Sequence, residues 1–109
     1  MTTADLQRTA EAWAQPWQTD LGLHWTDLEA VRRRLNAKVS GDEAEDWLSY
    51  TLRRHFADRL PLARCYSLGC GHGEVERRLA RLGAFVRCEA SDLSEGAIAE
   101  ARRAAAAEG

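Results

Sequence analysis

A glycine-rich turn constrains the fold of this chain more than any other sequence feature. Residues 68–73 read LGCGHG, with glycine at every second position. Glycine reaches positive φ values without a steric penalty and lets the backbone approach a ligand closely. Residues 65–68 before the turn are short and apolar, which predicts a buried strand. Residues 73–82 after it predict a helix, with one face marked by Val75, Leu79 and Leu82.

A second strand and a second helix are predicted after this unit. Gly83 is placed to end the first helix, and residues 85–90 form the next strand. Asp92 and Ser94 can cap a last helix that begins near Glu95. A strand–helix–strand order predicts two adjacent parallel strands with a right-handed crossover. We therefore expect an α/β fold that contains the first β-α-β-α units of a Rossmann-like parallel sheet.

Three helices are predicted before Pro61, over residues 3–15, 27–39 and 43–56. Apolar residues in the second and third recur at three- and four-residue steps, which places them on one helix face. We expect these two helices to pack through the faces formed by Leu28, Val31 and Leu35, and by Leu48, Leu52 and Phe56.

Two pairs of residues mark the expected starts of those helices. Thr26 with Glu29, and Asp42 with Glu45, have the spacing of a capping box. In such a box the two side chains satisfy free N–H groups in the first turn. The pairs therefore predict helix starts close to residues 27 and 43.

Composition and charge exclude several classes of protein. The chain has 109 residues, 45% of them hydrophobic and 29% charged, which is the balance of a globular domain or of part of one. A net charge of -2 does not favour a nucleic-acid partner, so we assign the Arg32–Arg34 run to a solvated helix face. No apolar run reaches the roughly 20 residues that span a bilayer. With no signal-peptide pattern either, we expect a cytoplasmic protein without a membrane partner.

The cysteines indicate reduced thiols. Cys65, Cys70 and Cys88 are odd in number and form no CxxC pair. Disulfide frameworks and zinc sites normally need paired or closely spaced cysteines. We therefore expect neither a disulfide nor a metal site.

An acidic residue follows the glycine turn at the distance typical of nucleoside-binding sheets. Asp92 lies at the end of the second predicted strand, about 20 residues after the turn, where a carboxylate can accept hydrogen bonds from ribose hydroxyls. Dinucleotide-binding sheets need a third glycine at the position that Glu74 occupies here. The alternative is a plain turn between packed elements, with Asp92 acting only as a helix cap.

Residues 63–103 resemble the class I S-adenosylmethionine-dependent methyltransferases. The segment LGCGHGEVERRLARLGAF is similar to the family's first motif, and Asp92-Leu93-Ser94 to its acidic second-strand motif. The segment DWLSYTLRRHF, just before the first strand, looks like the N-terminal extension of some bacterial members. The resemblance implies a methyltransferase that uses S-adenosylmethionine as its methyl donor.

The resemblance also implies roles for individual residues. The backbone of residues 69–71 would lie against the methionine part of the cofactor, Asp92 would hold the ribose, and Leu93 would flank the adenine. Ser67 stands where the family usually has an acidic residue. The implied cofactor-binding residues are Ser67, Leu68, Gly69, Cys70, Gly71, Gly73, Asp92, Leu93 and Ser94.

Methyl transfer from a sulfonium makes few demands on side chains. The enzyme aligns donor and acceptor and excludes water, and it needs a base only for an acceptor that holds its proton tightly. We assign no catalytic residue and no acceptor, and we interpret His72 as a spacer in the turn. Trp47 and Tyr50 are candidates for a lid by their proximity to the first strand, although we favour a packing role for them.

The domain organisation follows from these elements. We expect residues 1–61 to form a helical N-terminal extension and residues 62–109 the first half of a Rossmann-like S-adenosylmethionine-binding domain. The family's later strands are missing, so we expect an N-terminal fragment that is inactive alone and associates through an unpaired sheet edge. The alternatives are an NAD-binding Rossmann half and a non-catalytic helical interaction module with a vestigial cofactor loop.

Overall fold

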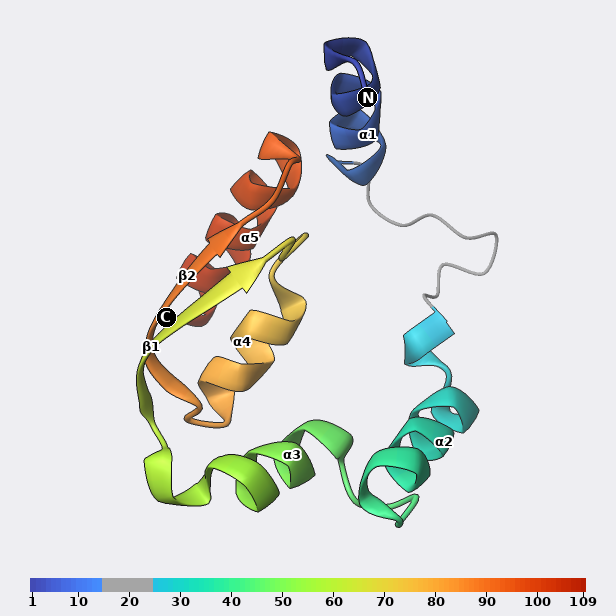
Figure 1. The fold of residues 1–109 in the computed structure, drawn as a ribbon, viewed down its shortest axis with the longest axis vertical. Coiled ribbons are helices and arrows are strands. Elements are labelled where there is room, and N and C mark those ends of the chain that lie inside the picture. Colours follow the sequence, from blue (N-terminus) through green and yellow to red (C-terminus); the bar gives the residue numbers. More distant parts are fainter. Residues whose placement is uncertain (15–24) are drawn as a thin grey trace. The chain divides into compact units, whose positions relative to one another are not determined.

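The computed structural model describes residues 1–14 and 25–109 (Figure 1). The chain divides into two compact units. A sheet unit comprises Met1–Pro16 and Pro61–Gly109, and a helical unit comprises Trp17–Leu60. The first helix, α1 (Thr3–Ala14), therefore belongs with the sheet. Gln15, the predicted end of that helix, lies outside the described residues.

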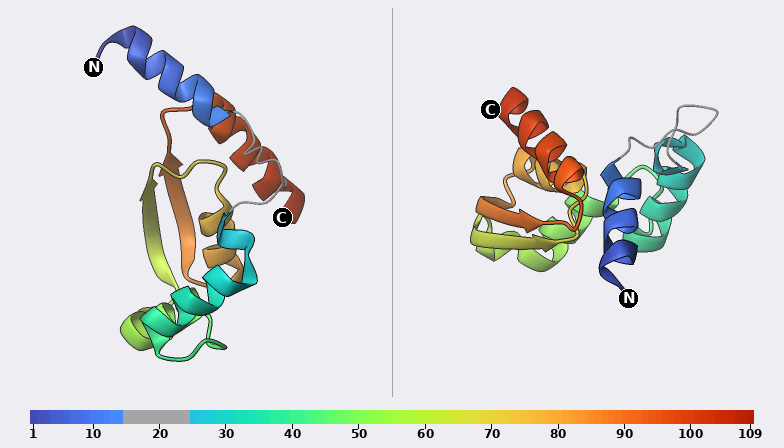
Figure 2. Two further views of the ribbon diagram at one scale, coloured as in Figure 1. Left: turned by 90° about the vertical axis from the view of Figure 1, so that its right-hand side faces the viewer. Right: turned by 90° about the horizontal axis from the view of Figure 1, so that it is seen from above.

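The sheet unit has the predicted strand–helix–strand order. After α1 its elements are β1 (Leu62–Leu68), α4 (Glu74–Arg81), β2 (Phe85–Ser91) and α5 (Glu95–Glu108). The two strands pair in parallel, with Cys65 opposite Cys88 and Ser67 opposite Ala90. Helices α4 and α5 lie on the same side of this two-stranded sheet (Figure 2). The α/β fold and the parallel pairing are confirmed.

Within the described part of the sheet unit, helices cover one face of the sheet. On the covered face, Cys65 and Ser67 are half-buried toward α4. On the other face, the side chains of Tyr66 and Leu68 are 63% and 85% exposed. The prediction of a buried first strand is therefore wrong. Side chains alternate between the faces of a strand, and no described element of the sheet unit covers the second face.

The open face carries a polar network beside the exposed Leu68. Arg64 and Arg87 are direct neighbours across the strands, a pairing of like charges that by itself is unfavourable. The Glu89 carboxylate lies between them, 3.3 Å from the Arg64 guanidinium and 3.0 Å from that of Arg87. The Tyr66 hydroxyl donates to the Ser91 hydroxyl at 2.9 Å. These contacts suit a surface that is in contact with water.

Helix α5 is held by small residues and by two arginines of α4. Ala97 is buried against the rest of the sheet unit. The Arg77 side chain donates to the His72 carbonyl at 2.5 Å and lies 3.2 Å from the Glu108 carboxylate. Arg81 pairs with the same carboxylate at 2.7 Å. Charged groups on α4 thus replace apolar contacts in holding the last turn of α5.

In the helical unit, the second helix begins later than its sequence pattern indicates. The elements are η1 (Trp25–Asp27), α2 (Glu29–Ser40), α3 (Trp47–Phe56) and η2 (Ala57–Arg59). The residue at the N-cap of α2 is Leu28, with no side-chain capping bond. Thr26 lies within the 3-10 turn that precedes the helix, so the predicted Thr26–Glu29 capping box does not form.

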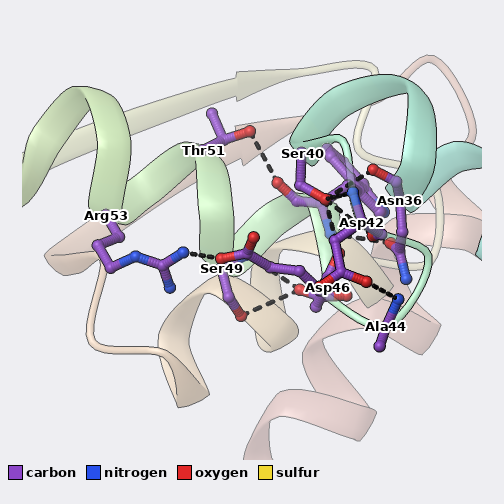
Figure 3. Close-up of polar contacts among 10 residues, drawn as sticks. Asn36, Ser40, Asp42, Ala44, Asp46, Ser49, Thr51 and Arg53 are labelled. Carbon is purple, nitrogen blue, oxygen red and sulfur yellow. Dashed lines mark hydrogen bonds and ion pairs between the residues drawn. The ribbon is translucent and has the colours of Figure 1, made fainter.

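The third helix begins at Trp47, four residues after its predicted start. The Asp42 carboxylate accepts from the Ala44 N–H at 2.8 Å and so closes a local turn (Figure 3). Asp46 caps α3 by accepting from the Ser49 N–H at 2.9 Å. The prediction of a capping box at Asp42 is wrong because aspartate can also hydrogen-bond to the backbone two residues ahead, outside a helix.

The predicted packing faces of α2 and α3 are largely confirmed. Leu48 is buried, and most of the remaining positions are half-buried. Leu28 is the exception, with 45% of its surface exposed, because it lies at the N-cap and outside the helix. Among residues 1–14 and 25–109, no helix has both the length and the apolar character required to cross a membrane.

The Asp46 cap generates a stability prediction. Asp46→Ala should lower the free energy of unfolding by about 1 kcal/mol, because the N–H and the hydroxyl of Ser49 in the first turn of α3 lose their acceptor. Asp46→Asn, which keeps an acceptor oxygen, should restore most of the loss. Urea unfolding followed by circular dichroism measures both. An equal or larger loss on Asp42→Ala would contradict the assignment of the cap.

The outer edge of β1 generates a second prediction. The Leu62 N–H donates toward β2, to the Ala84 carbonyl at 2.9 Å, so the N–H of Ala63 points away from β2. An unpaired strand edge is a template for pairing with another chain. We expect concentration-dependent association in sedimentation velocity, reduced by Ala63→Pro and retained by Ala63→Ser, which keeps the N–H. A monomer at every concentration would contradict the prediction.

Candidate functional site

The glycine turn adopts the backbone geometry for which its sequence is suited. Gly69, Gly71 and Gly73 have φ angles of 71°, 57° and 74°, a region that other residues rarely enter. A β-carbon added to Gly73 would lie 3.1 Å from the Ala101 side chain, so this glycine also lets α5 approach. A β-carbon on Gly69 or Gly71 would meet nothing within 4 Å. The first two glycines therefore leave open space beside the turn, on the side from which a ligand can approach.

Asp92 joins the glycine turn to the loop that follows β2. Its Oδ2 accepts from the Gly71 N–H at 2.8 Å, and its Oδ1 accepts from the Ser94 N–H at 2.8 Å. The two loops meet at the carboxyl ends of the parallel strands, where open α/β sheets bind their ligands. The structure thus brings together the two motifs that the sequence places 21 residues apart.

The N–H groups of the turn are used within the protein. Gly69 and Cys70 both donate to the Ser91 carbonyl, at 2.8 and 3.0 Å, and Gly71 donates to Asp92. The Gly73 N–H donates to the Cys70 carbonyl at 3.0 Å. A phosphate-binding loop needs such groups free and pointed at the anion. The backbone of this turn is therefore poorly suited to hold a phosphate.

A carboxylate that sequence reasoning missed lies beside β1. The Ser67 hydroxyl donates to Glu76 Oε1 at 2.5 Å, while Glu76 Oε2 is buried without a hydrogen-bond partner. Glu76 therefore places a carboxyl group beside Ser67, the position at which the resemblance implies an acidic residue. The available signal was its spacing: Glu76 precedes Leu79 by three residues, so both share a helix face. Val75, which the predicted apolar face includes, is exposed instead.

The remaining predicted cofactor residues differ in accessibility. Leu68 and Leu93 are exposed. Ser94 is fully buried and caps α5, its hydroxyl accepting from the Ala97 N–H at 3.1 Å. The Ser94 side chain is therefore structural, and only its neighbours in the loop are open to a ligand.

Cys65 and Cys88 lie opposite each other on the covered face of the sheet, and Cys70 lies in the glycine turn; all three are free cysteines. Burial, followed by the interaction with the adjacent Cys65 thiol, raises the pKa of the Cys88 thiol to about 11. Burial also raises the pKa of Cys70, with the Glu76 carboxylate as the second cause. These two thiols stay protonated at neutral pH, which makes them poor nucleophiles. In the described part of the chain, no group of histidine, cysteine and acidic side chains is arranged to hold a metal ion.

The last turn of α1 lies beside the glycine turn. His72 Nε2 is 3.4 Å from the Trp13 carbonyl oxygen. The sheet unit thus brings the backbone of Trp13 beside the turn. Trp47 and Tyr50 belong to the helical unit, and their role as a lid stays a prediction.

Comparisons of the chain with protein-family models, with curated proteins and with solved structures found no match. The function of the chain is therefore inferred from the residues of the glycine turn and of the loops around it.

The Cys88 thiol generates a pH prediction. Its pKa is higher in the folded state, so folding favours the neutral thiol, and the stabilisation is complete below the unfolded value. The free energy of unfolding should fall as the pH rises from about 9 toward about 11. Cys88→Ala should flatten this slope in urea titrations at several pH values. Parallel slopes for the wild type and the variant would contradict the prediction.

Proposed function

We propose that the glycine turn and Asp92 bind S-adenosylmethionine and that the protein takes part in methyl transfer. The observation that carries the proposal is the hydrogen bond between Gly71 and Asp92, which joins a glycine turn to an acidic loop at the carboxyl ends of two parallel strands. Nucleoside ligands bind at this edge of α/β sheets. Asp92 uses one lone pair of each oxygen internally, so a second on each can accept a ribose hydroxyl.

The charge around the turn favours a cationic ligand over a pyrophosphate. Glu74, Glu76 and Asp92 all lie in or beside the turn, and the described N–H groups of Gly69–Gly71 are already used. The Arg77 guanidinium also lies beside the turn, but it is paired with the Glu108 carboxylate. S-adenosylmethionine carries a sulfonium and an ammonium, both of which suit carboxylates and carbonyl oxygens. NAD would bring two phosphate charges to the same place. This difference supports S-adenosylmethionine over the dinucleotide alternative.

The proposed reaction demands alignment rather than a catalytic side chain. A lone pair of the acceptor forms a bond to the methyl carbon while the carbon–sulfur bond breaks, and S-adenosylhomocysteine leaves as a neutral thioether. The glycine turn and Asp92 would fix the position of the donor, and exclusion of water would strengthen the electrostatic contacts. Since only two strands form the described sheet, we expect the described residues alone to hold the donor weakly.

Titration calorimetry with S-adenosylmethionine, S-adenosylhomocysteine and NAD tests the proposal. The first two should bind and NAD should not. Asp92→Ala should weaken binding by about 2–4 kcal/mol, because two hydrogen bonds to a charged group are lost. Gly71→Val should weaken it at least as much, since its side chain would enter the open space beside the turn.

A folding control is needed because Asp92 also holds two N–H groups of the protein. The free energy of unfolding should be measured for each variant, and affinities compared only where the variant is folded. Tighter binding of NAD than of S-adenosylhomocysteine, or unchanged affinity in both folded variants, would overturn the proposal.

A further inference from the structure

The outer edge of β1 presents backbone groups that no described strand uses. The described sheet has the strand order β1-β2, so β1 pairs along one of its edges. The Leu62 N–H donates toward β2, and the direction of the N–H and C=O groups alternates from one residue of a strand to the next. Ala63, Cys65 and Ser67 therefore direct these groups away from β2, toward the outer edge.

The sequence of β1 is nearly symmetric about its middle residue. The strand reads LARCYSL, and Cys65 is its midpoint. In an antiparallel pair of two β1 strands that is centred on Cys65, every residue of the strand therefore lies opposite another. Leucine faces leucine at both ends, and Ala63 faces Ser67, so that bulky residues meet bulky ones and small residues meet small ones.

The remaining pair of this arrangement joins a cation to an aromatic ring. Arg64 of one copy lies opposite Tyr66 of the other, because these two residues flank Cys65. Both side chains are on the open face of the sheet and are accessible, with 74% of Arg64 and 63% of Tyr66 exposed. Opposed residues of antiparallel strands bring their side chains together on one face, where a guanidinium and a tyrosine ring attract each other. A two-fold axis forms this contact twice.

Neighbouring registers lack this complementarity. An antiparallel pair centred on Arg64 places two arginines directly opposite each other, which is unfavourable. A pair centred on Tyr66 places Arg64 opposite Leu68, and it leaves the first residue of β1 without an opposite residue in the strand. The register centred on Cys65 is therefore the one that uses the whole strand and opposes no like charges.

We propose that two copies of this chain associate through β1, in antiparallel orientation about a two-fold axis at Cys65. The strands then form one continuous sheet in the order β2-β1-β1-β2. The N–H and C=O groups of the outward-directed residues gain partners, and each copy contributes the same surface, as a two-fold dimer requires. The inference goes beyond the proposed function and does not depend on it, because no ligand takes part in the pairing.

Cys65 reports the register directly. Residues that form a hydrogen-bonded antiparallel pair have Cα atoms about 5.5 Å apart, which lies within the range that a disulfide spans. Cys70→Ser together with Cys88→Ala leaves Cys65 as the remaining thiol. Oxidation of this variant with copper phenanthroline should give a disulfide-linked dimer on a non-reducing gel.

A matched control moves the thiol two residues along the same edge. Ala63→Cys, combined with Cys65→Ser in the same background, keeps one thiol on the same face of the strand. In the proposed register this thiol lies opposite Ser67 and roughly 13 Å from its counterpart in the second copy. It should therefore give little linked dimer under the same oxidation.

Two arginine substitutions test the contact between the copies without any oxidation. Arg64 and Arg87 both pair with the Glu89 carboxylate, but Arg64 alone of the two belongs to the edge strand. Arg64→Ala should raise the dimer dissociation constant about tenfold, because two cation–π contacts are lost in each dimer. Arg87→Ala should leave the constant nearly unchanged. Sedimentation velocity over a series of concentrations measures both, and circular dichroism verifies that both variants are folded.

The outcomes decide between this dimer and other forms of association. Linked dimer from the Cys65 variant, little from the Ala63→Cys control and a weaker dimer for Arg64→Ala alone support the proposal. A linked dimer from the control in place of the Cys65 variant, or equal effects of Arg64→Ala and Arg87→Ala, would mean a different interface. A wild type that is monomeric at every concentration would overturn the proposal and leave the proposed function unaffected.

Discussion

The Asp92 carboxylate is the interaction on which the candidate site depends. It accepts one N–H from the glycine turn and one from the loop after β2, so a single side chain determines the spacing of two loops. Backbone N–H groups that are buried without an acceptor cost about 1–3 kcal/mol each, which gives the carboxylate a structural role before any ligand arrives. A ribose would use the lone pairs that remain. The Asp92 carboxylate therefore serves both the fold and the proposed binding. Measurements of stability and of affinity are both needed to separate these two roles.

One face of the two-stranded sheet is covered by helices of the sheet unit, and the other face is exposed. The sequence indicated the covered face but not the exposed one. The strand–helix–strand order, the parallel pairing and the ends of β2 and α5 follow from apolar runs, glycines and capping residues. The burial of β1 was predicted wrongly because a short apolar run does not reveal whether one face or both are covered. Tyr66 and Leu68 lie on the open face although their residue types favour burial.

The helix starts and the candidate site show the same limit. Asp42 and Asp46 are both competent caps, and only the surrounding turn determines that Asp46 is used. In the site, the glycines and Asp92 were predictable because their chemistry and spacing are local. Glu76 and α1 were not, since their places depend on how α4 packs on β1 and how α1 packs on α5. Contacts between elements that are distant in the chain leave little trace in a single sequence.

Arg77 gives the glycine turn a mechanical connection to the last turn of α5. One guanidinium holds the carbonyl of His72 and the carboxylate of Glu108, so fraying of that helix end removes one of the two anchors of the arginine. Helix ends open locally far more often than whole domains unfold. The hydrogen-exchange protection of the glycine turn should therefore fall when that of the end of α5 falls, because Arg77 connects the two. The rigidity of the glycine turn therefore depends in part on the end of a helix that is distant from the turn in the sequence.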